Sequence, residues 1–198
     1  WKCGSELDTT SDYFCNISKC GAVQSYKLTD VNAFQLLGME QKYSIDMNTL
    51  DVQYKNAQKL LHPDKFSAKD ILERNASAET SSTVNQAYQI LKSPINRAEY
   101  LLKVQFGVEV FDEGKILSVA DSSALMMEVF EVRERIDETE SLADLMLLLS
   151  NVREDIAQIE GAFASSSEGG HKDRAVRYAI RLKYFNKMVE EIEAKLPK

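Results

Sequence analysis

An imidazole and a carboxylate lie two residues apart in the tripeptide His62-Pro63-Asp64. Such a pair can act as a general acid and base, or it can offer hydrogen-bonding groups to a partner molecule. A catalytic pair usually needs a cleft and further polar groups, and no third group stands at a suggestive spacing. The sequence also has no glycine-rich phosphate loop, so we do not expect ATP hydrolysis by the chain itself. We therefore do not expect this pair to be catalytic, and a helix-end turn without a partner is the simplest structural alternative.

The residues before the tripeptide predict a helix that presents it. Pro63 fixes its own φ and disfavours helix at His62, so the helix should end there. Spacings of four, three and four predict one apolar face, made of Leu50, Tyr54, Ala57 and Leu61. Lys55 and Lys59 lie off this face, and Lys65 follows the loop. Helix lysines are commonly only a solvated face, but the formal net charge is −7, so this local positive charge is informative.

A second helix should follow the loop and run back along the first. One face of it is formed by Val84, Ala87, Tyr88 and Leu91. Ser93-Pro94 should end this helix, and residues 95–102 should begin another. Two facing helices joined by a loop make an antiparallel hairpin.

Residues 30–103 resemble a J domain, the module by which co-chaperones stimulate DnaK-type ATP-driven chaperones. The resemblance rests on the short helix at 31–38, the lysine-bearing helix, the His-Pro-Asp loop, Asn-Gln-Ala-Tyr at 85–88, and the spacing of Pro94, Arg97 and Tyr100. It implies that the loop triggers ATP hydrolysis in the partner and that the positive helix face docks on it. The implied chaperone-binding residues are His62, Pro63, Asp64, Lys55, Lys59 and Lys65.

Composition favours an all-α chain. Of 198 residues, 44% are hydrophobic and 28% charged, which is ordinary for a soluble globular protein. Only eight glycines and three prolines are present, and long stretches lack both, which favours helices over a turn-rich β fold. The negative net charge makes nucleic acid an unfavoured partner, and the longest apolar run, residues 145–149, is too short to span a membrane. No signal or transit peptide is visible, and one could have been removed.

Residues 121–198 predict three amphipathic helices, which should pack as an antiparallel bundle because none can bury its stripe alone. The second should run from about Ser141, capped with Asp144, to Phe163. Residues 165–170, Ser-Ser-Ser-Glu-Gly-Gly, predict a flexible loop that Asp173 ends by capping the last helix. Residues 104–120 should link the bundle to the J domain. Apolar stripes are expected at Leu142, Leu145, Met146, Leu149, Val152, Ile156 and Ile159 of the second helix.

A J domain followed by a three-helix bundle is similar to the HscB co-chaperones, called Jac in fungi. Residues 125–138 resemble the segment that binds the iron–sulfur scaffold protein in this family, and Tyr184 occupies the place of a contacting aromatic on the last helix. On that match the scaffold-binding residues are Met126, Met127, Phe130, Glu131, Glu134, Glu138 and Tyr184.

The alternative for these apolar residues is the bundle core, which is the commoner role of such a stripe. However, Leu125, Met126, Met127, Val129 and Phe130 cover more of the helix circumference than one core face needs. Some should therefore be exposed, and exposed methionines suit an adaptable interface. We expect Met127 and Phe130 to be contact residues, whereas both roles, contact and core, stay open for Met126.

All three cysteines, Cys3, Cys15 and Cys20, lie in the first 20 residues. Eukaryotic HscB proteins often carry a small zinc-binding knot there, built from two Cys-x-x-Cys pairs. The four-residue gap between Cys15 and Cys20 is within the range for structural zinc, but three thiolates are one ligand short of a tetrahedron. Asp8, Asp12 or water are candidates for the fourth. Free thiols, or one disulfide with a leftover cysteine, are the alternatives.

His171 should be a solvated loop residue.

The sequence thus predicts a cysteine-bearing segment at 1–26, a J domain at 30–103, a linker at 104–120 and a scaffold-binding bundle at 121–198. The family resemblance implies a co-chaperone that delivers an iron–sulfur scaffold protein to a DnaK-type chaperone in the mitochondrial matrix. A J protein for another client, or a metal-binding protein centred on the cysteine segment, are the alternative functions.

Overall fold

The computed structural model describes residues 2, 12–15, 20–110 and 122–197. Within these ranges the regular structure is helical, apart from one isolated antiparallel bridge between Phe14 and Val23. The predicted all-α class is therefore confirmed. None of the helices in the described ranges is long and apolar enough to cross a bilayer. Contacts divide the chain into two compact units, Trp1–Arg97 and Ala98–Lys198.

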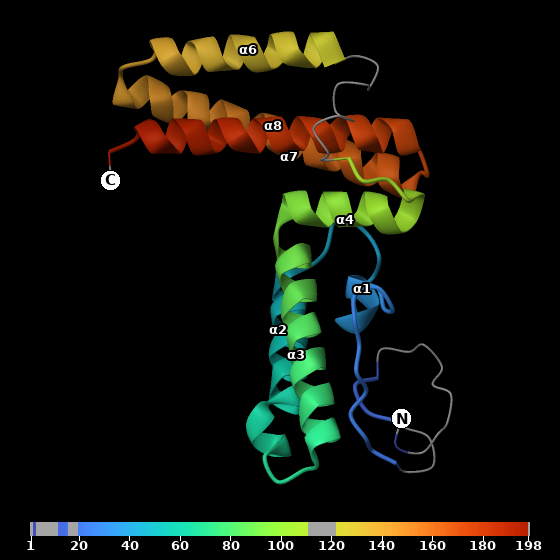
Figure 1. The fold of residues 1–198 in the computed structure, drawn as a ribbon. Helices are drawn as coiled ribbons and strands as arrows, with labels where there is room; N and C mark the ends of the chain where they lie inside the picture. The colour runs from blue at the N-terminus through green and yellow to red at the C-terminus, as the bar shows by residue number, and fades with distance from the viewer. Residues whose placement is uncertain (1, 3–11, 16–19, 111–121, 198) are drawn as a thin grey trace. The chain divides into compact units, whose positions relative to one another are not determined.

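The centre of the first unit is an antiparallel helical hairpin of α2 (Met47–Leu61) and α3 (Ile71–Lys92) (Figure 1). Asp46 begins α2 by accepting the Asn48 and Thr49 amides, and Asp70 begins α3 by accepting the Glu73 amide. The short α1 (Ala33–Leu36) packs on α3. The buried side chains of the hairpin include Leu50, Ala57, Leu61, Val84, Ala87 and Leu91.

A buried arginine closes the far end of the hairpin. Ser93 follows α3 and α4 (Pro94–Phe106) begins at the predicted proline. The Arg97 guanidinium donates to the Leu91 carbonyl at 2.6 Å and lies over the Tyr43 ring, 4.8 Å from its centre. It thus supplies positive charge at the C-terminal end of α3, where free carbonyls attract it. Arg97, 7% exposed, is therefore a packing residue.

Helix α3 is longer than the hydrophobic pattern predicts. The polar stretch before Thr83 is helical from Ile71 onward. Apart from Ala76, its buried residues are polar ones that bond to neighbouring segments, namely Glu73, Ser77 and Thr80. A periodicity of apolar residues therefore could not reveal this part of the helix.

The N-terminal segment lies along α3. The Thr80 hydroxyl donates to the Gln24 carbonyl, and the Thr83 hydroxyl donates to the Tyr26 carbonyl at 2.6 Å. Lys2 forms an ion pair with the buried carboxylate of Glu73 at 3.1 Å. Ala22 and Val23 are fully buried. The described part of the cysteine-bearing segment is thus part of the first unit's packing and not a separate appendage.

The second unit contains three long helices, α6 (Ser122–Glu138), α7 (Leu142–Glu168) and α8 (Lys172–Lys195) (Figure 1). The most extensive packing joins α7 and α8. Helix α6 buries Val129 and Ile136. Two ion pairs, Arg133–Glu191 and Arg181–Glu128, join it to α8, and the Lys195 ammonium donates a hydrogen bond to the Ile136 carbonyl.

Two predictions in this unit are wrong. Residues 165–168 are not a loop, because α7 continues to Glu168 and buries Ser166 and Ser167. The Ser167 hydroxyl donates to the Gln105 side chain at 2.7 Å, and this tertiary bond offsets the serine's weak preference for helix. Leu142 and Met146 are exposed, although they continue the predicted stripe.

Two features near the helix ends follow prediction, whereas the cap of the last helix and the domain boundary differ. Ser141 caps α7 through the Asp144 amide. His171 is exposed, and as N-cap of α8 it makes no side-chain capping bond, so the predicted cap at Asp173 lies inside the helix. The contact division falls within α4, after Arg97, whereas the predicted J domain extends to 103. Of the predicted linker, 111–120 lie outside the described residues.

Candidate functional site

The His-Pro-Asp loop is a compact turn at the end of α2. His62 leaves the helix with φ −58° and ψ 130°, and Pro63–Phe66 forms one 3₁₀ turn. The Lys65 amide donates to the His62 carbonyl at 3.0 Å, and buried Phe66 anchors the end of the turn. The Asp64 side chain is 90% exposed and that of His62 is 58% exposed. The loop therefore holds both groups in fixed backbone and presents them to solvent.

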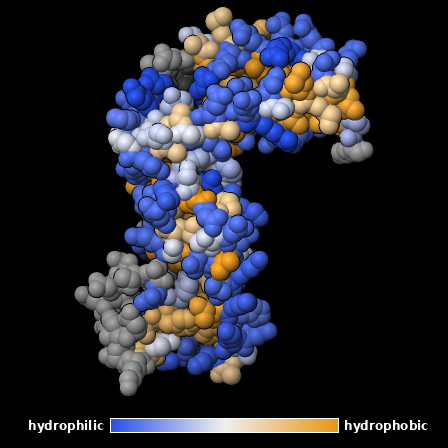
Figure 2. Space-filling model, turned by 180° about the vertical axis from the view of Figure 1, so that it is seen from behind, coloured by the Kyte–Doolittle hydropathy of each residue, from blue (hydrophilic) through white to orange (hydrophobic). Residues whose placement is uncertain are grey.

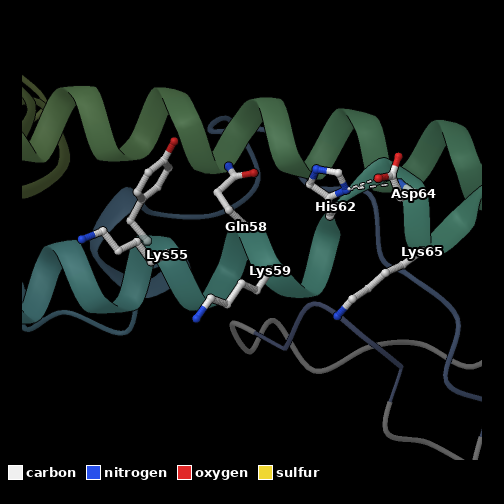
Figure 3. Close-up of a pocket in the computed structure, with 7 residues that line it drawn as sticks. Lys55, Gln58, Lys59, His62, Asp64 and Lys65 are labelled. Atoms are coloured by element: carbon white, nitrogen blue, oxygen red, sulfur yellow. Dashed lines mark hydrogen bonds and ion pairs between the residues drawn. The ribbon is translucent and has the colours of Figure 1, made fainter.

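Five of the six predicted chaperone-binding residues line one shallow pocket. Its walls are made of Tyr54, Lys55, Gln58, Lys59, His62, Asp64 and Lys65. Figure 3 shows the Lys59 and Lys65 side chains directed away from α3 and the Gln58 side chain directed toward it. Pro63 shapes the loop but is not among the lining residues. Three ammonium groups beside one carboxylate give this surface net positive charge, which complements an acidic partner.

Tyr54 and Gln58 are pocket residues that the sequence did not single out for function. Tyr54 stacks on Tyr88, with ring centres 4.1 Å apart, and its hydroxyl donates to the Asn85 side chain at 2.8 Å. Gln58 donates to the same Asn85 oxygen at 2.8 Å. The sequence placed Tyr54 on the apolar face of the helix and gave no sign that its hydroxyl would form a hydrogen bond. No sequence pattern marks Gln58.

The predicted scaffold-binding residues lie on α6 and α8. Met127 and Phe130, three residues apart on α6, are 67% and 68% exposed, as expected for contact residues. Met126 and Tyr184 are half-buried. Tyr184 lies one turn after Arg181, which bonds to Glu128 of α6 at 2.6 Å, so these turns of the two helices are neighbours. The acidic residues Glu131, Glu134 and Glu138 are all exposed.

A second group of exposed apolar residues lies on α7, where Leu142, Met146 and Leu147 are 48%, 59% and 61% exposed. Figure 2 shows apolar side chains gathered at the end of the second unit that carries the C-terminus. The contact of Lys195 with the Ile136 carbonyl brings the ends of α6 and α8 together there, near the start of α7.

The cysteine site is described only in part. Cys3 lies outside the described residues. Cys15 is buried and Cys20 half-buried, the Cys15 amide donates to the Ala22 carbonyl at 2.8 Å, and the Gly21 amide donates to the Cys15 carbonyl at 3.1 Å. Gly21 has φ +62°, which a glycine adopts readily. No group of three or more candidate metal ligands gathers among the described residues. A pair of thiolates can supply part of a tetrahedral zinc site, which needs four ligands.

Comparison with known proteins identifies the family. The iron–sulfur cluster co-chaperone HscB homolog of Arabidopsis thaliana is 35% identical over 196 residues, which cover 99% of this chain and 73% of that protein. The mouse iron–sulfur cluster co-chaperone HscB is 32% identical, covering 98% of this chain and 80% of that protein. This chain belongs to the HscB family of iron–sulfur cluster co-chaperones. The family model named HSCB C-terminal oligomerisation domain matches residues 121–193.

Solved HscB structures share the fold of both units. The human co-chaperone HscB has a TM-score of 0.83 and 28% identity, covering 98% of this chain and 96% of that one. The HscB chaperone of Vibrio cholerae has a TM-score of 0.71 and 27% identity, covering 83% of this chain and 96% of that one. The HscB arrangement of a J domain followed by a helical bundle therefore applies to this chain.

Proposed function

We propose that this HscB-family chain docks on a DnaK-type ATP-driven chaperone through the pocket beside the His-Pro-Asp loop. It thereby stimulates the chaperone's ATPase while the second unit holds an iron–sulfur scaffold protein. The observation that carries the proposal is the gathering of Lys55, Lys59, Lys65, His62 and Asp64 around one exposed pocket. The chain contributes recognition, and hydrolysis takes place in the partner.

The chemistry of the pocket supports an acidic docking partner. Lys55, Lys59 and Lys65 are exposed and flexible, so they can pair with carboxylates without a large desolvation cost. Such contacts raise the association rate more than the final affinity. Asp64 lies in the same pocket, on the turn directly before Lys65, where its exposed carboxylate can accept hydrogen bonds from a cationic group of the partner.

The scaffold site is proposed on the exposed face of α6. Met127 and Phe130 offer a large apolar contact, and the exposed carboxylates of Glu131, Glu134 and Glu138 follow it along the same helix. An apolar centre with a charged rim is the usual arrangement of a specific protein interface. Met126 and Tyr184 add the half-buried edge of the same surface.

The deciding experiment is a steady-state ATPase assay of the cognate chaperone with the full chain, with and without the scaffold protein. We expect stimulation by the wild-type chain, more with scaffold present. His62→Gln should remove it and leave thermal unfolding unchanged, because an exposed loop side chain contributes little to stability. Near-normal stimulation by folded His62→Gln would refute the docking role of the loop. Scaffold-independent stimulation, with another client captured in pull-downs without ATP, would favour the alternative J-protein function.

Zinc binding and a mitochondrial matrix location complete the proposal. Cys3, Cys15 and Cys20 are the chain's candidate thiolate ligands, and the zinc would serve a structural role. Metal analysis should compare the wild-type protein with Cys15→Ser and Cys20→Ser, because removing residues 1–26 would also uncover α3. Equal zinc content in all three proteins would exclude this site. Subcellular fractionation tests the location, which is proposed from the eukaryotic relatives.

A further inference from the structure

Helix α3 presents a polar stripe to α2. The stripe consists of Ser77, Ser81 and Asn85, spaced four residues apart and hence on one helical face. We call these three residues the polar ladder. They lie beside apolar packing that already joins the two helices, such as the stack of Tyr54 on Tyr88.

Each member of the polar ladder bonds to α2. The Ser77 hydroxyl donates to the Leu61 carbonyl at 2.8 Å, and the Ser81 hydroxyl donates to the Gln58 oxygen at 2.9 Å. The Asn85 oxygen accepts from both the Tyr54 hydroxyl and the Gln58 amide, each at 2.8 Å. Gln58 also donates to the Ser81 carbonyl at 3.3 Å.

The three α2 partners share one relation to the docking pocket. Tyr54, Gln58 and Leu61 each directly precede a docking residue, namely Lys55, Lys59 and His62. Successive residues of a helix point about 100° apart. Locking the first residue of each pair toward α3 therefore turns Lys55 and Lys59 toward the pocket and sets where the loop begins. In Figure 3, Gln58 points to α3 while Lys59 points away from it.

Hydrogen bonds add a precision that apolar contacts lack. Apolar attraction is non-directional, so a helix can slide or turn slightly on its neighbour at small cost. Hydrogen bonds weaken steeply with distance and angle, so the polar ladder fixes both the axial position and the rotation of α2 on α3.

The most critical rung is Ser77. Leu61 is the last residue of α2, and its carbonyl has no partner within the helix. Ser77 is 1% exposed, so its hydroxyl supplies a buried bond at the residue before His62. Removing this bond frees the end of α2 while leaving the two lysine-bearing turns held by Ser81 and Asn85.

We propose that the polar ladder is a positioning device for chaperone stimulation, in which Ser77 holds the His62 loop in place relative to the docking lysines. This inference rests on the proposed chaperone docking. It separates two functions within one pocket: the lysines determine how tightly the chain docks, and the position of the loop determines how strongly the docked chain stimulates hydrolysis.

The test is a titration of full-length Ser77→Ala in the chaperone ATPase assay. The maximal stimulated rate should fall roughly threefold to tenfold, the factor that corresponds to one hydrogen bond of ordinary net strength. The half-maximal concentration should stay near the wild-type value, because Lys55 and Lys59 are unchanged.

Thr80→Val is the matched control. It removes another buried hydroxyl of α3, but one bonded to the Gln24 carbonyl of the N-terminal segment. It should lower stability and leave maximal stimulation unchanged at a temperature well below unfolding. If Ser77→Ala behaves like Thr80→Val, the polar ladder is only structural and the inference is overturned. A raised half-maximal concentration with an unchanged maximum would equally overturn it, because the lysines would then be the affected group.

An NMR measurement on the chain alone gives an independent readout. Ser77→Ala should shift the backbone amide signals of Asp64 and Lys65, whereas Thr80→Val should not. Unchanged loop signals in Ser77→Ala would contradict a positioning role. Failure of the wild-type chain to stimulate the chaperone would overturn the proposed function itself, an outcome distinct from a failure of Ser77→Ala alone.

Discussion

At the His-Pro-Asp loop, the Nδ1 atom of His62 contacts two groups of Asp64. It accepts the Asp64 amide at 3.3 Å and lies 3.5 Å from the Asp64 carboxylate. Both contacts keep the ring beside Asp64. The residue pair was visible in the sequence, and its exposure followed from the proline. Its neighbours Tyr54 and Gln58 were not, because their importance depends on which residues of α3 lie opposite them.

At the other end of α2, Asp46 makes stability depend on pH. The Thr49 hydroxyl and the Thr49 amide both donate to the carboxylate and hold its pKa below its ordinary value, and the hydroxyl has the larger effect. The stabilisation is therefore present above the ordinary pKa and is lost as pH falls through the lowered one. We expect wild type to melt at a higher temperature than Asp46→Asn at neutral pH, with the difference closing in acid. Asp155→Asn, an exposed carboxylate within α7, should show no such convergence. A difference that persists unchanged at low pH would exclude the charge as its cause.

At the scale of elements, the spacing of apolar residues correctly predicted those helical segments whose buried faces are apolar. The α2 face of Leu50, Ala57 and Leu61 is buried as expected. The first half of α3 and the last turn of α7 were missed because, apart from Ala76, their buried residues are serine, threonine and glutamate. These polar residues are buried through bonds to segments distant in sequence, such as Thr80 to Gln24. Local propensity contains no information about such partners.

The N-terminal segment should stabilise the first unit. Deleting residues 1–26 removes the buried side chain of Val23, whose burial alone is worth roughly 1.5–3 kcal/mol. It also removes the Gln24 and Tyr26 carbonyls, which accept hydrogen bonds from the Thr80 and Thr83 hydroxyls. We expect the free energy of unfolding of this unit to fall by about 3 kcal/mol or more in denaturant titrations. Lys27→Ala, which removes only the exposed ion pair with Glu79, should cost less than about 1 kcal/mol. A deletion as mild as Lys27→Ala would mean that the segment contributes little.

At the scale of the whole molecule, each unit carries its own candidate surface. The docking pocket belongs to α2 and the loop of the first unit, and the exposed apolar face belongs to α6 of the second. The sequence anticipated this division of labour because the two surfaces differ in chemistry, one cationic and one apolar with an acidic rim. The exposed residues of α7 were not anticipated, since their spacing matches a core stripe and only the packing of α7 against α8 distinguishes them.

The apolar face of α6 should bind the scaffold protein without contributing to stability. Replacing Met127 and Phe130 together by Ala should abolish scaffold pull-down and leave the melting temperature nearly unchanged, because both side chains are already two-thirds exposed. Adding Tyr184→Ala should lower the melting temperature slightly, since that ring is half-buried. Chaperone stimulation measured without scaffold should be normal in both variants, because the docking pocket lies in the other unit.

The matched control uses the apolar residues of α7. Met146→Ala with Leu147→Ala removes side chains of similar size and exposure from the same unit, so it loses similar surface hydrophobicity. Retained pull-down with this pair, and loss with the α6 pair, would assign scaffold binding to α6 specifically. Equal loss of pull-down in both variants would mean that the contact extends over α7 or depends on nonspecific hydrophobic binding. A sharply lowered melting temperature for the α6 pair would instead place those residues in the core, where each truncation costs roughly 2–5 kcal/mol.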